Sequence, residues 1–267
     1  MSKLKNAALA LALTLVLTGA PQISHGATFG SVTHIHSVKV FGNKILMGTH
    51  EGLYLYQAAN SMKKLGSEDF DVMGLAISGQ IIYSSGHPGA TSKLPNPIGL
   101  LESTDAGKSW KKISLQGKVD FHMLEVGKND IYGVDSSNEQ LMYSSDRGKN
   151  WRKLGKNQYS DIAVLSAKSA SAYGLLLGSL VRTTDAFATS TAIKSSLKWS
   201  SVEIVGSTLY ASSGKAIYRS ADSGKNWKKI ATLAGEISGI SINKEIIVAI
   251  ANDTIFISSD GGKSFKS

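Results

Sequence analysis

The stretch Ser144–Trp151, SSDRGKNW, recurs in five variants along this chain of 267 residues. The other copies read STDAGKSW at 103–110, TTDAFATS at 183–190, SADSGKNW at 220–227 and SSDGGKSF at 258–265. Their aspartates are 41, 39, 37 and 38 residues apart, at Asp105, Asp146, Asp185, Asp222 and Asp260. A period of about 40 with strand-forming residues between the copies is typical of a radial repeat, in which small sheets pack around an axis. The repeat therefore predicts an all-β fold, a β-propeller.

Each copy of this motif is expected to form a tight turn. Asp and Ser side chains can accept hydrogen bonds from backbone N–H groups a few residues further on, and Gly adopts the positive φ that such turns need. The aromatic residue at the eighth position can pack between neighbouring sheets. The third copy has neither the Gly nor the aromatic residue, since Phe187 and Ser190 stand in their places. We therefore expect its turn to have drifted.

The chain after residue 26 is long enough for six units of about 40 residues. Alternating β-branched and aromatic residues support strands throughout, and no segment reads as a long helix. We predict a six-bladed β-propeller over residues 27–267, in which residues 28–33 close the ring by adding an outer strand to the last blade. Antiparallel order places the repeated turns on one rim. The starts of the first strands and the loops after the second strands share the other rim.

The first residues, 1–26, read as a signal peptide for export. Lys3 and Lys5 precede an apolar run at 7–17, and small residues come before Ala27. The run is too short for a membrane span, and no second apolar stretch follows it. Cysteine is absent throughout, so the fold has to be stable without disulfides. We predict a secreted or cell-surface protein with no membrane span.

The chain is basic. Its net charge is +9, and removing Lys3 and Lys5 with the signal leaves +7. Many of the remaining lysines flank the repeated turns, among them Lys111, Lys112 and Lys149. A regular lysine after each turn is most simply a solvated rim that protects the edges of the outer strands. We expect a monomer with no nucleic-acid partner.

Five histidines follow residue 26, and all belong to the first three blades: His34, His36, His50, His87 and His122. Three lie at the expected starts of first strands, and two follow second strands. By the antiparallel order all five occupy the rim opposite the repeated turns, which we call the histidine rim. An insertion at 89–99 lies on the same rim. It is either a tolerated surface loop or a segment that shapes ligand access.

The histidine rim offers the side chains of a transition-metal site. His34 and His36 are two residues apart on a strand, so both side chains project to one face. His122 occupies the equivalent strand position to His36 in the third blade, and Met73 occupies it in the second blade as a softer ligand that favours copper. Neutral imidazole with carboxylate suits zinc or copper. The predicted metal ligands are His34, His36, His50, His87, His122 and Met73.

Acidic residues are expected to complete this rim. The slot of His34 is filled in four other blades by Asp71, Asp120, Asp161 and Glu236. Two carboxylates roughly 5 to 9 Å apart, one with a raised pKa, could serve a glycoside hydrolase, so these four are the candidate catalytic residues. A simpler interpretation stays open, in which the histidines are ordinary surface residues and the acids line a watery channel.

The repeated turn resembles the Asp-box (BNR) repeat of sialidases, sortilin-type receptors and photosystem II assembly factors. In those families the box is a structural turn remote from the active site, which implies a structural role for the five motif aspartates. Five further segments are similar to a group of exported bacterial Asp-box propellers commonly called glycosylhydrolase family proteins. These segments are THIH at 33–36, GTHEGL at 48–53, SGHP at 85–88, PNPIGL at 95–100 and DFH at 120–122. The resemblance covers nearly the whole chain after the signal but implies no established activity.

Three functions are compatible with these residues. The first is a secreted propeller whose histidine rim binds a metal, a small molecule, a glycan or a protein in a binding or accessory role. The second is a glycoside hydrolase that uses the carboxylates. It would not be a sialidase, because the four arginines lie in or beside the repeated turns, on the wrong rim for an arginine triad: Arg147, Arg152, Arg182 and Arg219. The third is a protein-docking scaffold like the photosystem assembly propellers.

Overall fold

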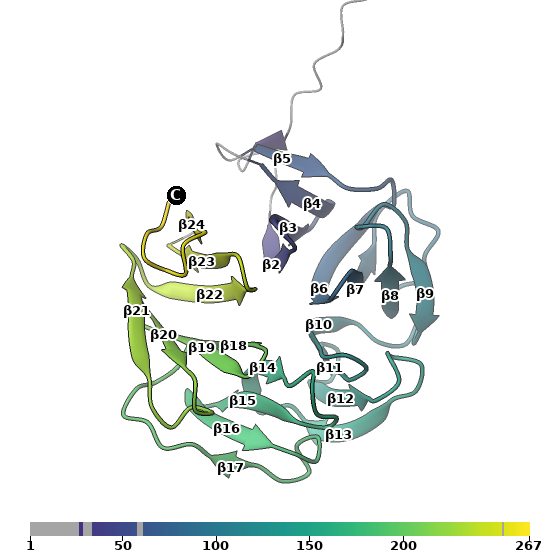
Figure 1. Ribbon diagram of the computed structural model, residues 1–267. Helices are drawn as coiled ribbons and strands as arrows, with labels where there is room; N and C mark the ends of the chain where they lie inside the picture. The colour runs from purple at the N-terminus through teal and green to yellow at the C-terminus, as the bar shows by residue number, and fades with distance from the viewer. Residues whose placement is uncertain (1–26, 29–33, 58–60, 253) are drawn as a thin grey trace, which may run out of the picture.

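The computed structural model describes residues 27–28, 34–57, 61–252 and 254–267. Within them the chain forms six antiparallel sheets around a central axis, which confirms the predicted six-bladed β-propeller (Figure 1). The described residues contain no helix, and so no helix with the length and apolar character needed to cross a membrane. The predicted signal peptide, residues 1–26, lies outside the described residues.

The first three blades follow one another around the ring in sequence order. From its outer edge to the axis, blade 1 has the strand order β1-β5-β4-β3-β2. The strands of blades 2 and 3 run outward from the axis in chain order. Blade 1 comprises β1 (Ala27–Thr28), β2 (Ile35–Phe41), β3 (Lys44–Thr49), β4 (Gly52–Tyr56) and β5 (Ser61–Lys64). Blade 2 comprises β6 (Phe70–Ser78), β7 (Ile81–Pro88), β8 (Leu100–Ser103) and β9 (Lys111–Ser114). Blade 3 comprises β10 (Phe121–Val126), β11 (Ile131–Asp135), β12 (Gln140–Ser144) and β13 (Arg152–Lys156).

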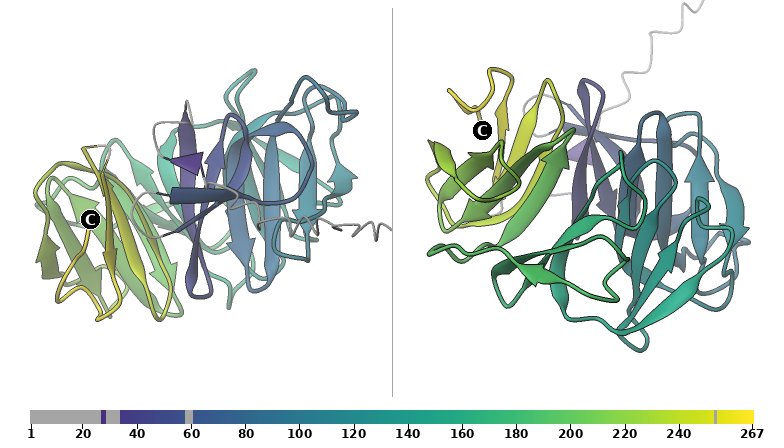
Figure 2. Two further views of the ribbon diagram at one scale, coloured as in Figure 1. Left: turned by 90° about the horizontal axis from the view of Figure 1, so that it is seen from above. Right: turned by 60° about the horizontal axis from the view of Figure 1, so that its bottom comes forward.

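The other three blades repeat this plan, and blade 6 has three strands. Blade 4 comprises β14 (Tyr159–Val164), β15 (Ala172–Leu176), β16 (Ser179–Thr183) and β17 (Thr191–Ala192). Blade 5 comprises β18 (Ser201–Val205), β19 (Thr208–Ser213), β20 (Ala216–Ser220) and β21 (Lys228–Thr232). Blade 6 comprises β22 (Ile237–Ile242), β23 (Ile247–Ala251) and β24 (Thr254–Ser258). Figure 2 shows the strands of each blade running between the two rims.

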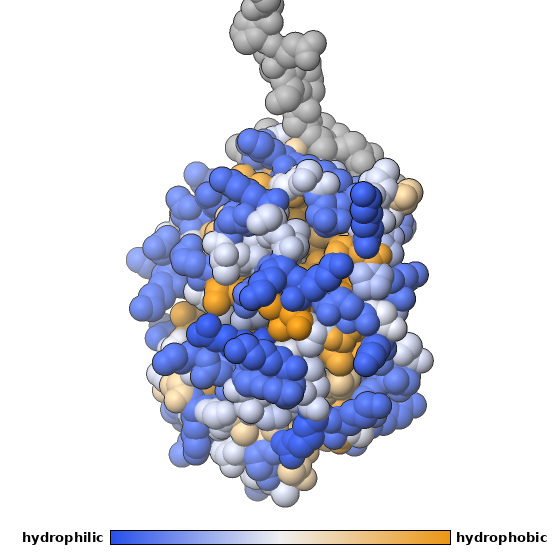
Figure 3. Space-filling model, turned by 90° about the vertical axis from the view of Figure 1, so that its right-hand side faces the viewer, coloured by the Kyte–Doolittle hydropathy of each residue, from blue (hydrophilic) through white to orange (hydrophobic). Residues whose placement is uncertain are grey.

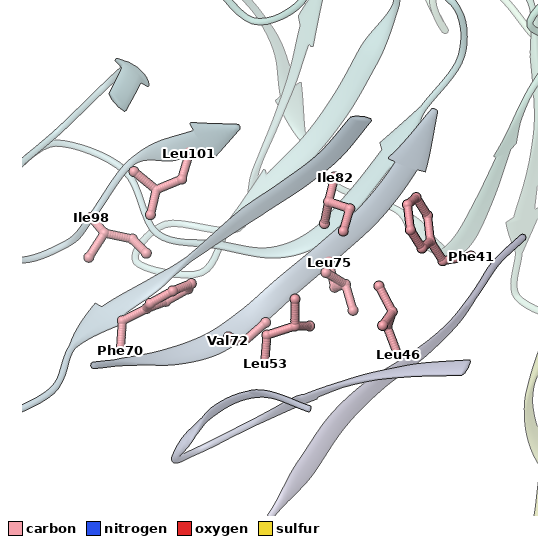
Figure 4. Close-up of a cluster of buried hydrophobic side chains, with 9 residues drawn as sticks. All are labelled: Phe41, Leu46, Leu53, Phe70, Val72, Leu75, Ile82, Ile98 and Leu101. Atoms are coloured by element: carbon pink, nitrogen blue, oxygen red, sulfur yellow. The ribbon is translucent and has the colours of Figure 1, made fainter. Parts of the chain in front are cut away.

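Apolar side chains between neighbouring blades form the core. Six buried clusters fill the six spaces around the ring. Figure 4 shows the cluster in which Phe41 and Leu46 of blade 1 pack against Phe70, Val72 and Ile82 of blade 2. Removing apolar surface from water stabilises such contacts by about 25 cal/mol per Å². A blade can bury both faces only when it has two neighbours, so this packing selects the closed ring.

The ring closes differently from our expectation. Thr28, with Ala27, pairs with β5 at the outer edge of blade 1, not with the last blade. Residues 29–33 lie outside the described residues. The outer edge of β24 is met instead by Lys266, which bridges Ile257. Side chains of blade 6 pack on those of blade 1 and close the ring. The N-terminal strand β1 stays in blade 1 and does not complete blade 6.

The repeated turns share one hydrogen-bond pattern. In the second copy Ser144 Oγ accepts from the N–H of Gly148 at 2.9 Å, and Asp146 Oδ1 accepts from the N–H of Asn150 at 2.9 Å. The third copy keeps both bonds at the same distances, with Phe187 in place of the Gly and Thr189 in place of the Asn. The expectation that this turn had drifted was wrong, because Phe187 adopts the positive φ, 60°, that the turn requires.

The outermost strands are exposed and rich in cations. Exposed residue pairs of this kind are Lys111 and Lys112 on β9, Arg152 and Lys153 on β13, and Lys228 and Lys229 on β21. The face shown in Figure 3 is accordingly mostly hydrophilic, with separate apolar patches. Cations along an edge strand discourage pairing with another chain.

Candidate functional site

The strand pairing places the five histidines on the rim opposite the repeated turns. In blade 3, Phe121 at the start of β10 pairs with Asp135 at the end of β11, whereas the turn follows Ser144 at the far end of β12. The histidines occupy equivalent places near such strand ends: His34 precedes β2, His36 lies in β2, His50 follows β3, His87 lies near the end of β7, and His122 lies near the start of β10.

Two separate groups of potential metal ligands form on this rim, each with two imidazoles and one carboxylate. Triad 1 is His36, His50 and Asp71, and triad 2 is His87, Asp120 and His122. In each triad the candidate ligand atoms all lie within 4.8 Å of one another. The structure therefore divides the predicted histidines and carboxylates into two groups, and His34 belongs to neither. Met73 lines a cavity on the axis.

Triad 1 joins blade 1 to blade 2. Asp71 Oδ1 lies 3.0 Å from Nε2 of His36, and Asp71 Oδ2 lies 2.8 Å from Nδ1 of His50. The carboxylate side chain is only 12% exposed. Its Oδ1 is buried and accepts no aligned hydrogen bond despite the short contact with His36. His34 flanks the triad, with its ring centre 6.4 Å from that of each histidine.

Triad 2 joins blade 2 to blade 3 around a more deeply buried carboxylate. Asp120 Oδ2 lies 2.7 Å from Nε2 of His122 and 3.1 Å from Nε2 of His87, and it accepts the hydroxyl of Ser136 at 2.6 Å. The side chain of Asp120 is 7% exposed. Its other oxygen, Oδ1, is buried without a hydrogen-bond partner. A buried carboxylate oxygen without a partner is costly unless a cation compensates it.

The insertion of blade 2 orients one of these histidines. Asn96 Oδ1 lies 3.1 Å from Nδ1 of His87, and Asp120 Oδ2 lies 3.1 Å from its Nε2. A neutral imidazole has one N–H, so it can donate to only one of these two acceptors. Two electron-rich atoms at this distance repel each other unless a proton or a metal ion lies between them. The insertion is itself anchored by Thr91, whose N–H and hydroxyl donate to Asp69 at 3.0 and 2.7 Å.

Local backbone features explain why these side chains reach the rim. The pairing of the first strand with the second skips His36 in blade 1, Met73 in blade 2 and His122 in blade 3, so each sits in a β-bulge that turns its side chain. Gly86, just before His87, has φ +146°, and a Cβ there would lie 2.0 Å from the carbonyl oxygen of Asp71. Only glycine allows β7 to approach β6 this closely.

The four predicted carboxylates do not form one ring. Asp71 and Asp120 belong to the triads, and Glu236 is exposed. Asp161 is not in their slot, because Ile162 of β14 pairs with Gly174 as Leu124 of β10 pairs with Gly133, so Asp161 corresponds to Met123 and not to Asp120. Asp161 therefore lies further along its strand than Asp120 does, at a position where it lines the cavity on the axis.

That axial cavity has a volume of about 770 Å³ and contains a charged cluster that the sequence analysis missed. Lys39 on β2, Glu125 on β10 and Glu203 on β18 occupy the same register position in alternating blades. Lys39 Nζ lies 2.6 Å from Glu125 Oε1 and 3.6 Å from Glu203 Oε1. Asp161 lines the same cavity and accepts the N–H of Val202 at 2.7 Å.

One ammonium group faces three carboxyl groups in this cluster. Burial, and next the charge of Glu125, raise the pKa of Asp161 to about 7. Burial also raises the pKa of Glu203 to about 8, although Lys39 acts against that shift, and burial raises the pKa of Glu125. The cluster therefore holds protons at neutral pH. Its signal in the sequence is a lone charged residue between two apolar residues of a first strand, as in Leu124–Val126.

No protein-family model and no curated protein sequence matches this chain. Its fold matches solved structures, among them YCF48 bound to D1 peptide, with TM-score 0.51, 14% identity, and coverage of 88% of this chain and 82% of that one. The Niastella koreensis GH74 enzyme gives TM-score 0.60 at 14% identity over 88% of this chain and 37% of that enzyme. A chain of the nidogen/laminin complex gives TM-score 0.59 at 11% identity over 84% and 92%. Identities this low show the fold alone, so the comparisons place the chain among the β-propellers.

Proposed function

We propose that the histidine rim binds two transition-metal ions, one in each triad, and that the protein is an exported propeller with a metal-dependent binding or accessory role. The observation that carries the proposal is the donor set of triad 2. When a neutral His87 donates from Nδ1 to Asn96, its Nε2 lone pair faces Asp120. The second oxygen of Asp120 is buried without a partner. A metal cation satisfies both groups at once.

The geometry of the triads suits a small first-row metal ion. Nitrogen–oxygen contacts of 2.7 to 3.1 Å within the triads are slightly shorter than the spacing of about 3.3 Å between ligands bound at about 2.0 Å in a tetrahedral site. Small side-chain movements would admit the ion. Two imidazoles and one carboxylate leave a fourth position open for water or an external ligand. Zinc and copper both accept this nitrogen and oxygen set.

The test is metal content followed by calorimetry. Protein purified without a histidine tag is expected to carry up to two zinc or copper ions per chain, and metal-stripped protein is expected to rebind two. His36→Ala removes one ion, His122→Ala removes the other, and the double variant binds none. His34→Ala is the matched control, because His34 lies beside triad 1 without joining it, and it should retain both ions. Metal-free protein that binds neither ion at neutral pH would overturn the proposal.

A second candidate function is hydrolysis of a glycoside by the carboxyl groups of the axial cavity. The specific observation in its favour is the raised pKa of Asp161 and Glu203, since a carboxyl that is protonated near neutral pH can act as a general acid. A glycoside panel with and without chelator separates the two functions. Turnover that survives the chelator and disappears in Glu203→Gln supports the hydrolase. The absence of turnover on every substrate counts against it.

A further inference from the structure

A second pocket, of about 570 Å³, lies beside the third and fourth copies of the repeated turn, where blade 4 meets blade 5. Its lining includes Arg182, Thr184, Thr191, Lys194, Ser223 and Lys225. The outermost strand of blade 4, β17, has only two residues, whereas β9, β13 and β21 have four or five. The shorter strand leaves the edge of β16 less covered, which opens the pocket.

The charges around this pocket are all of one sign. Arg182, Lys194 and Lys225 line it, and no carboxylate does. None of these cations forms an ion pair with any residue that the structure describes. The nearby carboxylate of the third turn, Asp185, is instead held within that turn by the N–H and hydroxyl of Thr189, at 2.9 and 2.7 Å.

Arg182 is the arginine that lines this pocket. Its guanidinium carbon lies 5.9 Å from the ring centre of Tyr173, within the range of a cation–π contact. Its Nε is buried without a hydrogen-bond partner among the described residues. A buried N–H of a charged group carries a desolvation cost that an acceptor supplied by a ligand would remove.

We propose that this pocket binds a phosphate or sulfate ester. A guanidinium offers a planar fork of N–H donors that matches the oxygens of such a group. Lys194 and Lys225 add charge, and the hydroxyls of Thr184 and Ser223 can donate to the remaining oxygens. A pocket of this volume is in the range that encloses a small organic molecule, so there is room for the carrier of the ester as well. This proposal does not depend on the metal sites, which lie on the other rim.

The test is calorimetry of the full chain with glucose 6-phosphate, glucose 6-sulfate and glucose. We expect the two esters to bind and glucose not to bind, and the tighter ester identifies the physiological group. Arg182→Gln should weaken binding at least tenfold. Arg219→Gln is the matched control, because Arg219 occupies the same register position in blade 5 but lies outside the pocket, and it should bind like the wild type. Binding should also weaken as NaCl is raised.

A second variant tests the proposal independently, in case Arg182→Gln misfolds. Lys194→Gln/Lys225→Gln changes two exposed side chains and should weaken ester binding by a similar factor without altering the thermal midpoint. Equal binding of glucose and the esters, equal losses in Arg182→Gln and Arg219→Gln, or no ester binding at 10 mM, roughly the weak end of useful affinity, would each overturn the proposal.

Discussion

At the scale of single residues, the carboxyl groups of this protein divide by environment. Asp146 of the second turn is partly exposed and accepts hydrogen bonds from the backbone and side chain of Asn150, which lower its pKa to about 2. Glu203 in the axial cavity has lost water, which raises its pKa to about 8. Both groups have ordinary values near 4 in water. The same chemical group is therefore a fixed anion in the turns and a proton carrier in the cavity.

Asn96 is expected to tune triad 2 without binding the metal. Replacing it by Ala removes the acceptor at Nδ1 of His87, so the imidazole can rotate and change tautomer. Loss of such a supporting partner lowers metal affinity roughly 10- to 100-fold. Calorimetric titration of Asn96→Ala with zinc should show one unchanged site and one weakened site. Lys93→Ala, an exposed change in the same insertion, is the control, and equal losses in the two variants would contradict a specific role for Asn96.

Glu203 is expected to make the protein less stable as the pH rises from about 5 to 8. Because its pKa is raised on folding, the folded state holds a proton that the unfolded state has released in this range. Proton binding by the folded state stabilises it, and that stabilisation disappears as the pH passes through about 8. Thermal midpoints measured from pH 5 to 8 should fall for the wild type and fall less for Glu203→Gln. Glu245→Gln, an exposed change, should follow the wild type, and parallel curves for all three proteins would contradict the assignment.

At the scale of elements, the turn is the unit that the sequence specifies best. Five copies at nearly constant spacing predict the fold and the rim that carries the turns, because a turn is built from side chains close to one another in sequence. The slot of Asp161 could not be predicted in this way. Strand register places Asp161 at the position that corresponds to Met123 and not to Asp120, and a repeat spacing that varies from 37 to 41 residues conceals this offset. Likewise, the pairing of Lys39 with Glu125 spans 86 residues and depends on strand register.

The turn aspartates are expected to set the acid limit of stability. The pKa values of Asp105, Asp146, Asp185 and Asp222 are lowered to about 2 by hydrogen bonds from their own turns. A lowered pKa contributes stability that is present above about pH 4 and is lost as the pH falls through 2. The thermal midpoint should therefore drop steeply between pH 4 and 2. In Asp146→Asn the midpoint should be lower at pH 5 and should vary less with pH, whereas a curve parallel to that of the wild type would contradict this role.

At the scale of the whole molecule, closure of the ring decides whether six sheets form one propeller. Blade 6 meets blade 1 through an apolar cluster in which Val248 and Ile255 pack with Val38 and Val40. The packing of each blade on two neighbours makes closure cooperative, because an open ring would leave two apolar faces in water. The axial cluster joins residues of blades 1, 3 and 5, so it needs the blades to surround the axis, whereas each histidine–aspartate triad needs only two adjacent blades.

Ser241 is expected to stabilise the contact between blade 6 and blade 1 through a hydrogen bond. Its hydroxyl on β22 accepts the N–H of Val40 on β2 at 3.0 Å, in a place where both residues are buried. Ser241→Ala leaves that N–H without an acceptor, which should lower the free energy of unfolding by about 1 to 3 kcal/mol. Urea denaturation followed by fluorescence measures the loss. Ser238→Ala, an exposed change on the same strand, should alter stability by less than about 0.5 kcal/mol. If the two variants were equally stable, the apolar packing of blade 6 on blade 1 alone would account for closure of the ring.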